Sequence, residues 1–438
     1  MTTPTLAVPD AARRTKAKKA TGVAAFGTFI EYYDFSVYGY VAATLAIVFF
    51  PGDDPVIGLL NTLLVFGSAF IVRPLGAVFF GRLGDRKGRR TSLIASITCM
   101  GVAATLTGLL PGYAQIGVLA PILLVLLRML QGFSTGGEIG GAAAYIHEWA
   151  APNRRSLFVS LIPSVAQLGK GLAAGLAALA AAMMPAADLA AWGWRIPFLL
   201  ALPLGILCLV MRLKVEDSPE FQAINKTTEG TSKAPFKEVL TKYPKALAKV
   251  TSISLVQNLG TYIGTVFVAV YFSEVLGFTK GEASTIVLLA VLFAALLIPM
   301  AGQLGSRIGS KKVLLWAYVA YVAITIPSFA MMNQGSFVLA LLGLGMGIIP
   351  YALCQAGTYG AMLEFYPTRV RHTGVAFGHS VGAVIGGGAG PYLATYLIDL
   401  TGNTFVPAFI LVGAGALGLL VVGLTVRANS DPTSHLYR

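Results

Sequence analysis

Apolar segments of about 20 residues or more recur along nearly the whole of this 438-residue chain. An α-helix needs a stretch of that length to cross a bilayer core of roughly 30 Å. Because lipid offers no hydrogen-bond partner to the backbone, such segments are expected to be helical. A mean hydropathy of +0.74 and only 12% charged residues agree with a polytopic membrane protein. We predict an all-α membrane protein with twelve transmembrane helices, near residues 21–50, 57–81, 91–111, 118–149, 156–184, 194–213, 246–276, 282–305, 312–332, 336–365, 372–398 and 404–427.

Lysine and arginine gather on one side of the predicted membrane. When the twelve spans are threaded alternately, 27 of the 32 Lys and Arg fall on the side of the amino terminus, and only Arg195 and Lys280 fall on the opposite side. Positively charged short loops are characteristic of the cytoplasmic side. We therefore expect both termini in the cytoplasm and a multi-pass protein of the plasma (inner) membrane. The formal net charge of +13 follows from this topology, so we expect no nucleic-acid partner.

An internal repeat divides the chain. The segment GRLGDRKGRR (residues 81–90) follows the second span, and GQLGSRIGSKK (302–312) follows the eighth. The two copies are 221 residues apart and share Gly, Leu, Gly, Arg, Gly and a closing basic residue, with Ser306 in the second copy where the first has Asp85. The chain is therefore expected to consist of two similar halves.

A second pair of segments supports the repeat. EWAAPNRR (148–155) follows the fourth span, and EFYPTRVR (364–371) follows the tenth. Duplicated halves that enclose a site near the bilayer midplane are a common build of secondary transporters. We predict three parts: an N-terminal six-helix bundle, a polar cytoplasmic linker and a C-terminal six-helix bundle, at residues 1–213, 214–245 and 246–438.

Six ionisable side chains lie inside the first five spans. A charge at the bilayer centre costs roughly 2.5 to 3.5 kcal/mol, so intramembrane charges are expected to be paired and functional. Counted from the cytoplasmic ends, most of them lie at a similar depth, and three acids with three bases give a neutral group. The six are Glu31, Asp34, Arg73, Arg128, Glu138 and Lys170.

Helical spacing places most of these charges on polar stripes, because residues three, four and seven apart share a helix face. The stripes predict three walls of a wet cavity in the first half, and neutral polar side chains in spans seven and ten are expected to complete it. The predicted substrate-binding residues are Tyr38, Arg128, Gln131, Gln167, Lys170, Gln257, Asn258, Tyr262, Tyr351, Gln355 and Tyr359.

Such a cluster predicts how a proton and an anion would be coupled. A neutral group of buried charges that takes up a proton gains an excess positive charge, and a carboxylate substrate would cancel it. Proton and anion then favour each other's binding, which is symport. The candidates for proton uptake are Asp34, Glu31 and Glu138. We expect Asp34 to face the cavity with Arg128, and Glu31 to form the more structural pair with Arg73.

The same motifs resemble a known family. GRLGDRKGRR after a second span is similar to the loop signature of the major facilitator superfamily. Together with it, IEYYDF, RMLQGFSTGGEIGGA, WGWRIPFLLALPLGI and EDSPEF resemble the metabolite:proton symporter family. That family includes permeases for 2-oxoglutarate, shikimate, citrate and proline or betaine. The resemblance implies the major facilitator fold and alternating access between two bundles.

The signature loop also predicts a cytoplasmic gate. Asp85 is placed where it could interact with the positive end of a neighbouring helix. In the resembling superfamily this signature stabilises the outward-open state. The expected gate residues are Gly81, Asp85, Arg86, Arg89, Glu148 and Arg154.

These observations predict a proton-coupled symporter that imports a small carboxylate-bearing metabolite. A symporter of a zwitterionic compatible solute, such as proline or betaine, is the alternative. A drug/proton antiporter would share the fold, but QLGKGLAAGL (167–176) in span five lacks the glycine-proline motif of such exporters. We find no nucleophile constellation or metal-ligand spacing and expect no enzyme activity, metal or cofactor. The expected partners are the solute, protons and lipid, and the expected state is a monomer.

Overall fold

A computed structural model describes residues 10–87, 89–136, 155–213, 235–366 and 368–428. The elements of the first half are α1 (Asp10–Tyr40), α2 (Ala42–Phe49), α3 (Pro55–Lys87), α4 (Arg89–Leu109), α5 (Tyr113–Ile116), α6 (Leu119–Thr135), α8 (Arg155–Met183), α9 (Ala186–Asp188), the π-helix η2 (Leu189–Gly193) and α10 (Arg195–Leu213).

The second half begins with a short helix in the predicted linker and continues with six longer helical stretches. Its elements are α12 (Pro235–Lys242), α13 (Pro244–Tyr262), η3 (Ile263–Phe267), α14 (Val268–Val270), η4 (Tyr271–Val275), α15 (Lys280–Ile308), α16 (Ser310–Met332), α17 (Phe337–Leu363), α18 (Thr368–Ala383), η5 (Val384–Ala389), α19 (Gly390–Thr401) and α20 (Val406–Ala428).

The twelve predicted spans all coincide with helix in the described residues. Nine described helices are long and apolar enough to cross a membrane, and shorter apolar helices at Ile94–Leu109 and Leu119–Thr135 form the third and fourth spans. The first span consists of α1 and α2, which meet at Val41. The described helix of the fourth span ends at Thr135, and the rest of that predicted span lies outside the described residues. The prediction of an all-helical, twelve-span fold is confirmed.

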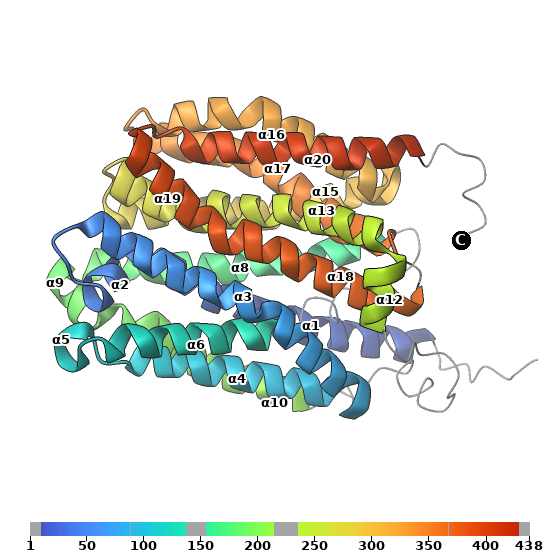
Figure 1. Ribbon diagram of the computed structural model, residues 1–438, viewed down its shortest axis with the longest axis horizontal. Helices are drawn as coiled ribbons and strands as arrows, with labels where there is room; N and C mark the ends of the chain where they lie inside the picture. Colours follow the sequence, from blue (N-terminus) through green and yellow to red (C-terminus); the bar gives the residue numbers. More distant parts are fainter. Residues whose placement is uncertain (1–9, 88, 137–154, 214–234, 367, 429–438) are drawn as a thin grey trace, which may run out of the picture.

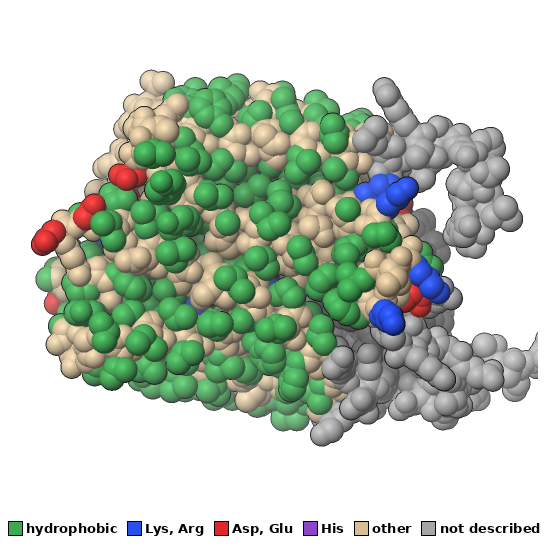
Figure 2. Space-filling view, in the orientation of Figure 1, with side chains coloured by type: hydrophobic (Ala, Val, Ile, Leu, Met, Phe, Trp, Pro, Cys, Tyr) green, Lys and Arg blue, Asp and Glu red, His purple; other side chains and the backbone are tan. Residues whose placement is uncertain are grey.

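The helices run side by side along the long axis of the molecule (Figure 1). The start of α1 and the end of α20 lie at the same end, on the right of Figure 1, which we call the terminal end. Figure 2 shows Lys and Arg side chains at this end, and hydrophobic side chains over most of the surface between the two ends. This arrangement fits a helical bundle that crosses a membrane.

The two halves meet along a small set of helices. Helix α8 packs against α15 and α17, α3 packs against η5, α18 and α19, and α1 packs against η3 and α14. The linker helix α12 packs on α18, where the rings of Phe236 and Phe377 are 4.8 Å apart. Charged residues on α1, α3 and α8 are therefore placed where the first half faces the second.

The spans of the second half contain irregular turns at the level of this contact. The seventh span passes through the π-helices η3 and η4, and the eleventh span passes through η5. Single π-turns inside α-helices are frequent at functional sites. Of these turns, η3 packs against α1 and η5 packs against α3, so they mark part of the surface where the second half faces the first.

Candidate functional site

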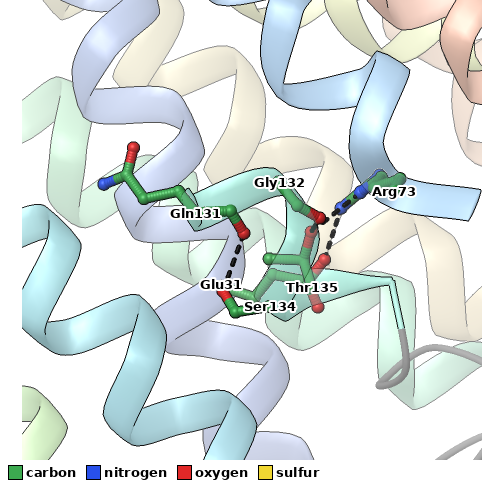
Figure 3. Close-up of polar contacts among 6 residues, drawn as sticks. All are labelled: Glu31, Arg73, Gln131, Gly132, Ser134 and Thr135. Carbon is green, nitrogen blue, oxygen red and sulfur yellow. Dashed lines mark hydrogen bonds and ion pairs between the residues drawn. The ribbon is translucent and has the colours of Figure 1, made fainter. Parts of the chain in front are cut away.

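Glu31 and Arg73 form a buried ion pair between α1 and α3. Arg73 Nη2 lies 2.6 Å from Glu31 Oε1, and Arg73 Nε donates a hydrogen bond of 2.9 Å to Thr135 Oγ1 on α6 (Figure 3). The guanidinium also lies over the Phe35 and Phe70 rings, at 4.9 and 5.3 Å from their centroids. The pair and its hydrogen bond to Thr135 join three helices of the first half.

A close crossing of α3 and α6 makes this arrangement possible. A Cβ added at Gly132 would lie 1.7 Å from the carbonyl oxygen of Ala69, and one added at Gly76 would lie 1.8 Å from that of Phe133. Only glycine allows two helix backbones to approach so closely. The crossing brings Thr135 within hydrogen-bond reach of Arg73.

Asp34 and Arg128 are connected through an amide side chain. Gln131 Nε2 donates to Asp34 Oδ1 at 3.0 Å, and Gln131 Oε1 accepts from Arg128 Nη1 at 2.7 Å. All three residues are buried. Asp34 Oδ2 and Arg128 Nε and Nη2 have no hydrogen-bond partner among the described residues. The expected proximity of Asp34 and Arg128 therefore takes the form of a bridge that leaves one acceptor and two donor groups available.

Aromatic rings surround the Arg128 guanidinium. Its Cζ lies 4.3, 5.0 and 5.5 Å from the ring centroids of Tyr38, Phe35 and Phe66. The Tyr38 hydroxyl donates to the carbonyl oxygen of Thr62. Cation–π contacts compensate part of the cost of burying the charge. Tyr38, a predicted substrate ligand, is thus placed against Arg128.

Lys170 on α8 reaches across to the second half. Its Nζ donates to Thr265 Oγ1 and Tyr351 Oη, both at 3.0 Å, and it lies 5.5 Å from the centroid of the Tyr32 ring. Gln167 Nε2, one turn earlier on α8, donates to the same Tyr351 hydroxyl at 2.8 Å. Lys170 is fully buried, and no carboxylate of the described residues lies within ion-pair distance of it. Among the described residues, the hydrogen-bond acceptors of this buried cation are neutral oxygens.

The polar residues of the second half form two groups, and Tyr359 lies between them because it hydrogen-bonds to Gln257 and packs beside His379. Gln257 Nε2 donates to Gln355 Oε1 at 2.8 Å, and Gln355 Nε2 donates to Thr261 Oγ1 at 2.7 Å. Thr261 lies on the same face of the seventh span as Thr265, so this network continues the Lys170 site.

The second group lies one turn nearer the terminal end. Asn258 Nδ2 donates to the carbonyl oxygen of Ser254 at 2.8 Å, and Ser254 Oγ lies 2.7 Å from His379 Nδ1. Tyr359, on α17, has its ring centroid 6.2 Å from that of His379. Asn258 is therefore held by its own helix and not by the Lys170 network.

Tyr262 packs between the halves. Its ring is edge-on to Phe66 and Phe70 of α3, with centroids 5.6 and 4.9 Å apart. This contact joins α13 of the second half to α3 of the first. Tyr262 is thus next to the rings that cover Arg73 and Arg128.

Several predicted residues cannot be placed. Glu138, Glu148 and Arg154 lie outside the described residues. Of the remaining gate residues only the helical backbone is described: Gly81, Asp85 and Arg86 in α3 and Arg89 in α4. The cytoplasmic gate and the role of Glu138 stay predictions.

Thr265 is a site residue that the sequence analysis missed. It follows Asn258 and Thr261 at helical spacing, so the polar stripe of the seventh span extends one turn further than we predicted. The extended stripe was the available signal. Among the described side chains, no group of three or more His, Cys, Asp or Glu could hold a metal.

Comparisons with known protein families and relatives agree with this architecture. Residues 20–253 match the family described as "Sugar (and other) transporter", and residues 250–436 match "Major Facilitator Superfamily". The chain is 33% identical over 427 residues to the proline/betaine transporter of Escherichia coli, covering 95% of this chain and 84% of the relative. It is 34% identical over 426 residues to the glycine betaine/proline/ectoine/pipecolic acid transporter OusA of Dickeya dadantii, with coverages of 94% and 84%.

Further matches include another bacterial transporter and a solved structure. The inner membrane metabolite transport protein YhjE of Escherichia coli is 34% identical over 409 residues, covering 91% of this chain and 92% of the relative. The proton:xylose symporter XylE bound to 6-bromo-6-deoxy-D-glucose superposes with a TM-score of 0.76 at 17% identity, covering 95% of this chain and 96% of that one. The structural likeness shows the shared fold. From the family matches and the relatives, we conclude that the chain belongs to the major facilitator superfamily and is a multi-pass membrane transporter, not an enzyme.

Proposed function

We propose that this transporter couples the import of a small carboxylate-bearing solute to the entry of protons. Lys170 carries the proposal, because it is a buried cation between the halves and its described hydrogen-bond partners are both uncharged. A charged group in such a place is a functional-site candidate by default. A carboxylate on the solute would supply the negative charge that the described partners of Lys170 do not.

The charges of the described cluster favour an anion. Two carboxylates, Glu31 and Asp34, stand against the three cations Arg73, Arg128 and Lys170. Glu31 is paired with Arg73, so the excess positive charge among the described side chains lies on the side of Arg128 and Lys170. A proton on Asp34 would increase that excess and strengthen the binding of an anion. We assign proton uptake to Asp34. Its Oδ2 atom, which has no hydrogen-bond partner among the described residues, is the oxygen available to receive the proton.

Polar side chains are proposed to line the binding site together with Arg128 and Lys170: Gln131, Gln167, Gln257, Gln355 and Tyr351. Their hydrogen bonds connect them either to Arg128 or to the Lys170 network. Three other predicted residues have no hydrogen bond to Lys170 and are proposed to contact the solute away from its carboxylate: Asn258, Tyr262 and Tyr359. Monomeric state, the absence of a cofactor and the three-part division of the chain stay predictions.

A zwitterionic compatible solute is the second candidate. Two relatives of high coverage are transporters of proline and betaine compounds by name. Such solutes carry one carboxylate and one cationic nitrogen. Lys170 could bind the carboxylate, while the aromatic rings near Arg128 and the free Asp34 oxygen offer the kinds of groups that attract a cationic nitrogen.

Uptake by the purified protein in proteoliposomes tests the proposal. With an inside-alkaline pH gradient, we expect accumulation of at least one solute from a panel of 2-oxoglutarate, citrate, shikimate, proline and glycine betaine, and loss of accumulation with an uncoupler. Competition between the dicarboxylates and the zwitterions separates the two candidates. If uptake of every transported solute were insensitive to the uncoupler, proton coupling would be contradicted.

The Lys170→Met variant tests the assigned cation. We expect uptake at low solute concentration to fall by about tenfold or more, because a hydrogen bond to a charged group is lost. Lys242→Met is the matched control, since the Lys242 side chain is 66% exposed at the terminal end and pairs only weakly with Glu238. Wild-type uptake by Lys170→Met would remove the central residue of the proposal.

A further inference from the structure

The hydrogen bonds of Lys170 connect the two halves of the transporter. Lys170 belongs to α8 in the first half, whereas Thr265 belongs to η3 and Tyr351 to α17 in the second half. Gln167 adds a third bond from α8 to the Tyr351 hydroxyl. A fourth contact comes from α1, where the Tyr40 hydroxyl donates to the backbone oxygen of Thr265 at 2.9 Å. Thr265 is thus held from two helices of the opposite half.

The two hydroxyl oxygens occupy positions that a carboxylate would need. A lysine ammonium group has three donors, and Thr265 and Tyr351 accept two of them at 3.0 Å each. A carboxylate also presents two acceptor oxygens to such a group, but with a full negative charge. Because the Lys170 ammonium is fully buried, it must have acceptors at every step at which the site is closed.

We propose that the hydroxyl groups of Thr265 and Tyr351 take the place of the solute's carboxylate when the transporter changes conformation without solute. In that state they accept the hydrogen bonds of Lys170 and hold the two halves together, which we call their stand-in role. This inference rests on the proposed function, because it requires Lys170 to be the carboxylate ligand. When solute binds, its carboxylate displaces the two hydroxyls from Lys170. When solute leaves, the hydroxyls return and join α8 to η3 and α17.

The proposal distinguishes two steps of the transport cycle. Net import requires the carrier to return without solute, whereas exchange of internal for external solute only requires the loaded carrier to cross in both directions. The stand-in contacts exist only in the carrier that returns without solute. Their loss should therefore slow net import and leave exchange intact, whereas loss of an ordinary solute ligand should impair both.

The Thr265→Val variant is the sharpest test. Valine keeps the shape of threonine and removes the oxygen that accepts from Lys170. In proteoliposomes we expect net uptake to fall by about tenfold, as for the loss of one hydrogen bond to a charged group. We expect solute exchange within about twofold of the wild type, with an apparent KM that is unchanged or lower because the competing hydroxyl is gone.

Thr395→Val is the matched control. Thr395 is also a buried threonine in the second half, and its hydroxyl donates to the backbone oxygen four residues earlier, as that of Thr265 does. It lies in α19 and has no hydrogen bond to Lys170. We expect net uptake and exchange of this variant to equal those of the wild type.

Tyr351→Phe provides a second test if Thr265→Val does not fold. It removes the oxygen that joins both Lys170 and Gln167 to α17. Because Tyr351 also lines the proposed site, we expect some loss of exchange and a larger loss of net uptake, so the ratio of exchange to net uptake should again rise. Equal losses of exchange and net uptake, or a raised KM in both assays, would overturn the stand-in role. If the wild type moves no carboxylate-bearing solute, the proposed function itself is wrong. If the wild type does transport such a solute but the two variants have the same ratio of exchange to net uptake as the wild type, only the stand-in role is wrong.

Discussion

The two carboxylates of the motif IEYYDF have different surroundings although they are only three residues apart. Glu31 is in direct contact with a guanidinium, at 2.6 Å. Asp34 meets the neutral Gln131 amide and keeps one oxygen without a partner among the described residues. A carboxylate in direct contact with a cation strongly favours the charged form, whereas a buried carboxylate without such contact accepts a proton more readily. This difference supports the proposed assignment of proton uptake to Asp34.

Replacing Asp34 with asparagine should separate solute movement from proton movement. The amide resembles a protonated carboxyl group but cannot release a proton. We expect Asp34→Asn to exchange solute at a rate comparable to the wild type and to show no solute-driven change of external pH. A pH electrode in a weakly buffered vesicle suspension measures this. Unchanged alkalinisation in the variant would show that another group carries the proton.

Replacing Glu31 with glutamine should mainly destabilise the protein. Breaking one side of a buried ion pair costs about 3 to 5 kcal/mol, because the remaining charge is left uncompensated. We expect Glu31→Gln to lower the thermal unfolding temperature in detergent. Glu364→Gln is the control, because Glu364 is half exposed and its pair with Lys311 at 3.0 Å is a surface ion pair worth about 0 to 1 kcal/mol. Equal effects of the two substitutions would contradict a structural role for the buried pair.

Residue-scale predictions from the sequence were limited by what helical depth can reveal. Depth in the spans placed most of these charges at a similar level, but depth alone could not decide which acid pairs with which arginine. It could not reveal that Gln131 lies between Asp34 and Arg128, because that depends on how α6 is rotated about its axis. The partner of Lys170 lies in the other half of the chain, and a single sequence gives no distance between halves.

At the scale of elements, the crossing of α3 and α6 positions the buried charges. Gly132 touches the α3 backbone, so a methyl group at this position would force the helices apart. We expect Gly132→Ala to reduce the yield of folded protein severely, as measured by fluorescence-detected size-exclusion chromatography. Gly101→Ala in α4 is the control, because a Cβ there meets no atom within 4 Å. Alanine favours helix over glycine by roughly 1 kcal/mol, so normal or improved folding is expected. Normal folding of Gly132→Ala would contradict the described crossing.

A second contact between elements joins the halves near the terminal end. The Leu157 amide, in the first turn of α8, donates to Ser306 Oγ of α15 at 3.2 Å. Ser306 stands where the first copy of the repeat has Asp85, and its neutral hydroxyl accepts from a backbone amide in the first turn of α8. We expect Ser306→Ala to speed hydrogen exchange of the Leu157 amide and Ser306→Asp to slow it, since a carboxylate is stabilising near a helix N-terminus. Ser252→Ala, which affects only a bond within α13, should leave that amide unchanged; equal exchange in all three variants would refute the contact.

Helical spans were predictable from apolar length, but their internal irregularities were not. The π-helices η3 and η5 and the separate helix α2 lie inside segments whose hydropathy is continuous. A π-turn changes which side chains face the partner by inserting one residue, and composition carries no signal for it. Thr265, in η3, still follows Asn258 and Thr261 at helical spacing, so it was missed because the predicted polar stripe was ended one turn too early.

At the scale of the whole molecule, the two halves have different chemical roles. The described intramembrane charges Glu31, Asp34, Arg73, Arg128 and Lys170 all belong to the first half, and the second half contributes hydroxyl and amide groups. The sequence predicted that the intramembrane charges lie in the first half, because charged residues inside apolar spans can be located once the spans and the repeat are known. The hydrogen bonds by which Thr265 and Tyr351 of the second half contact Lys170 of the first half were visible only in the structure.

The central claim is that a proton and a carboxylate-bearing solute enter together through this cluster. The most direct test records solute uptake and internal pH in the same proteoliposomes, without an imposed pH gradient, for the wild type, Asp34→Asn and Lys170→Met. The account predicts internal acidification that follows solute uptake in the wild type, no acidification in Asp34→Asn, and a fall of both uptake and acidification by about tenfold or more in Lys170→Met. Solute accumulation by the wild type without any change of internal pH would contradict it.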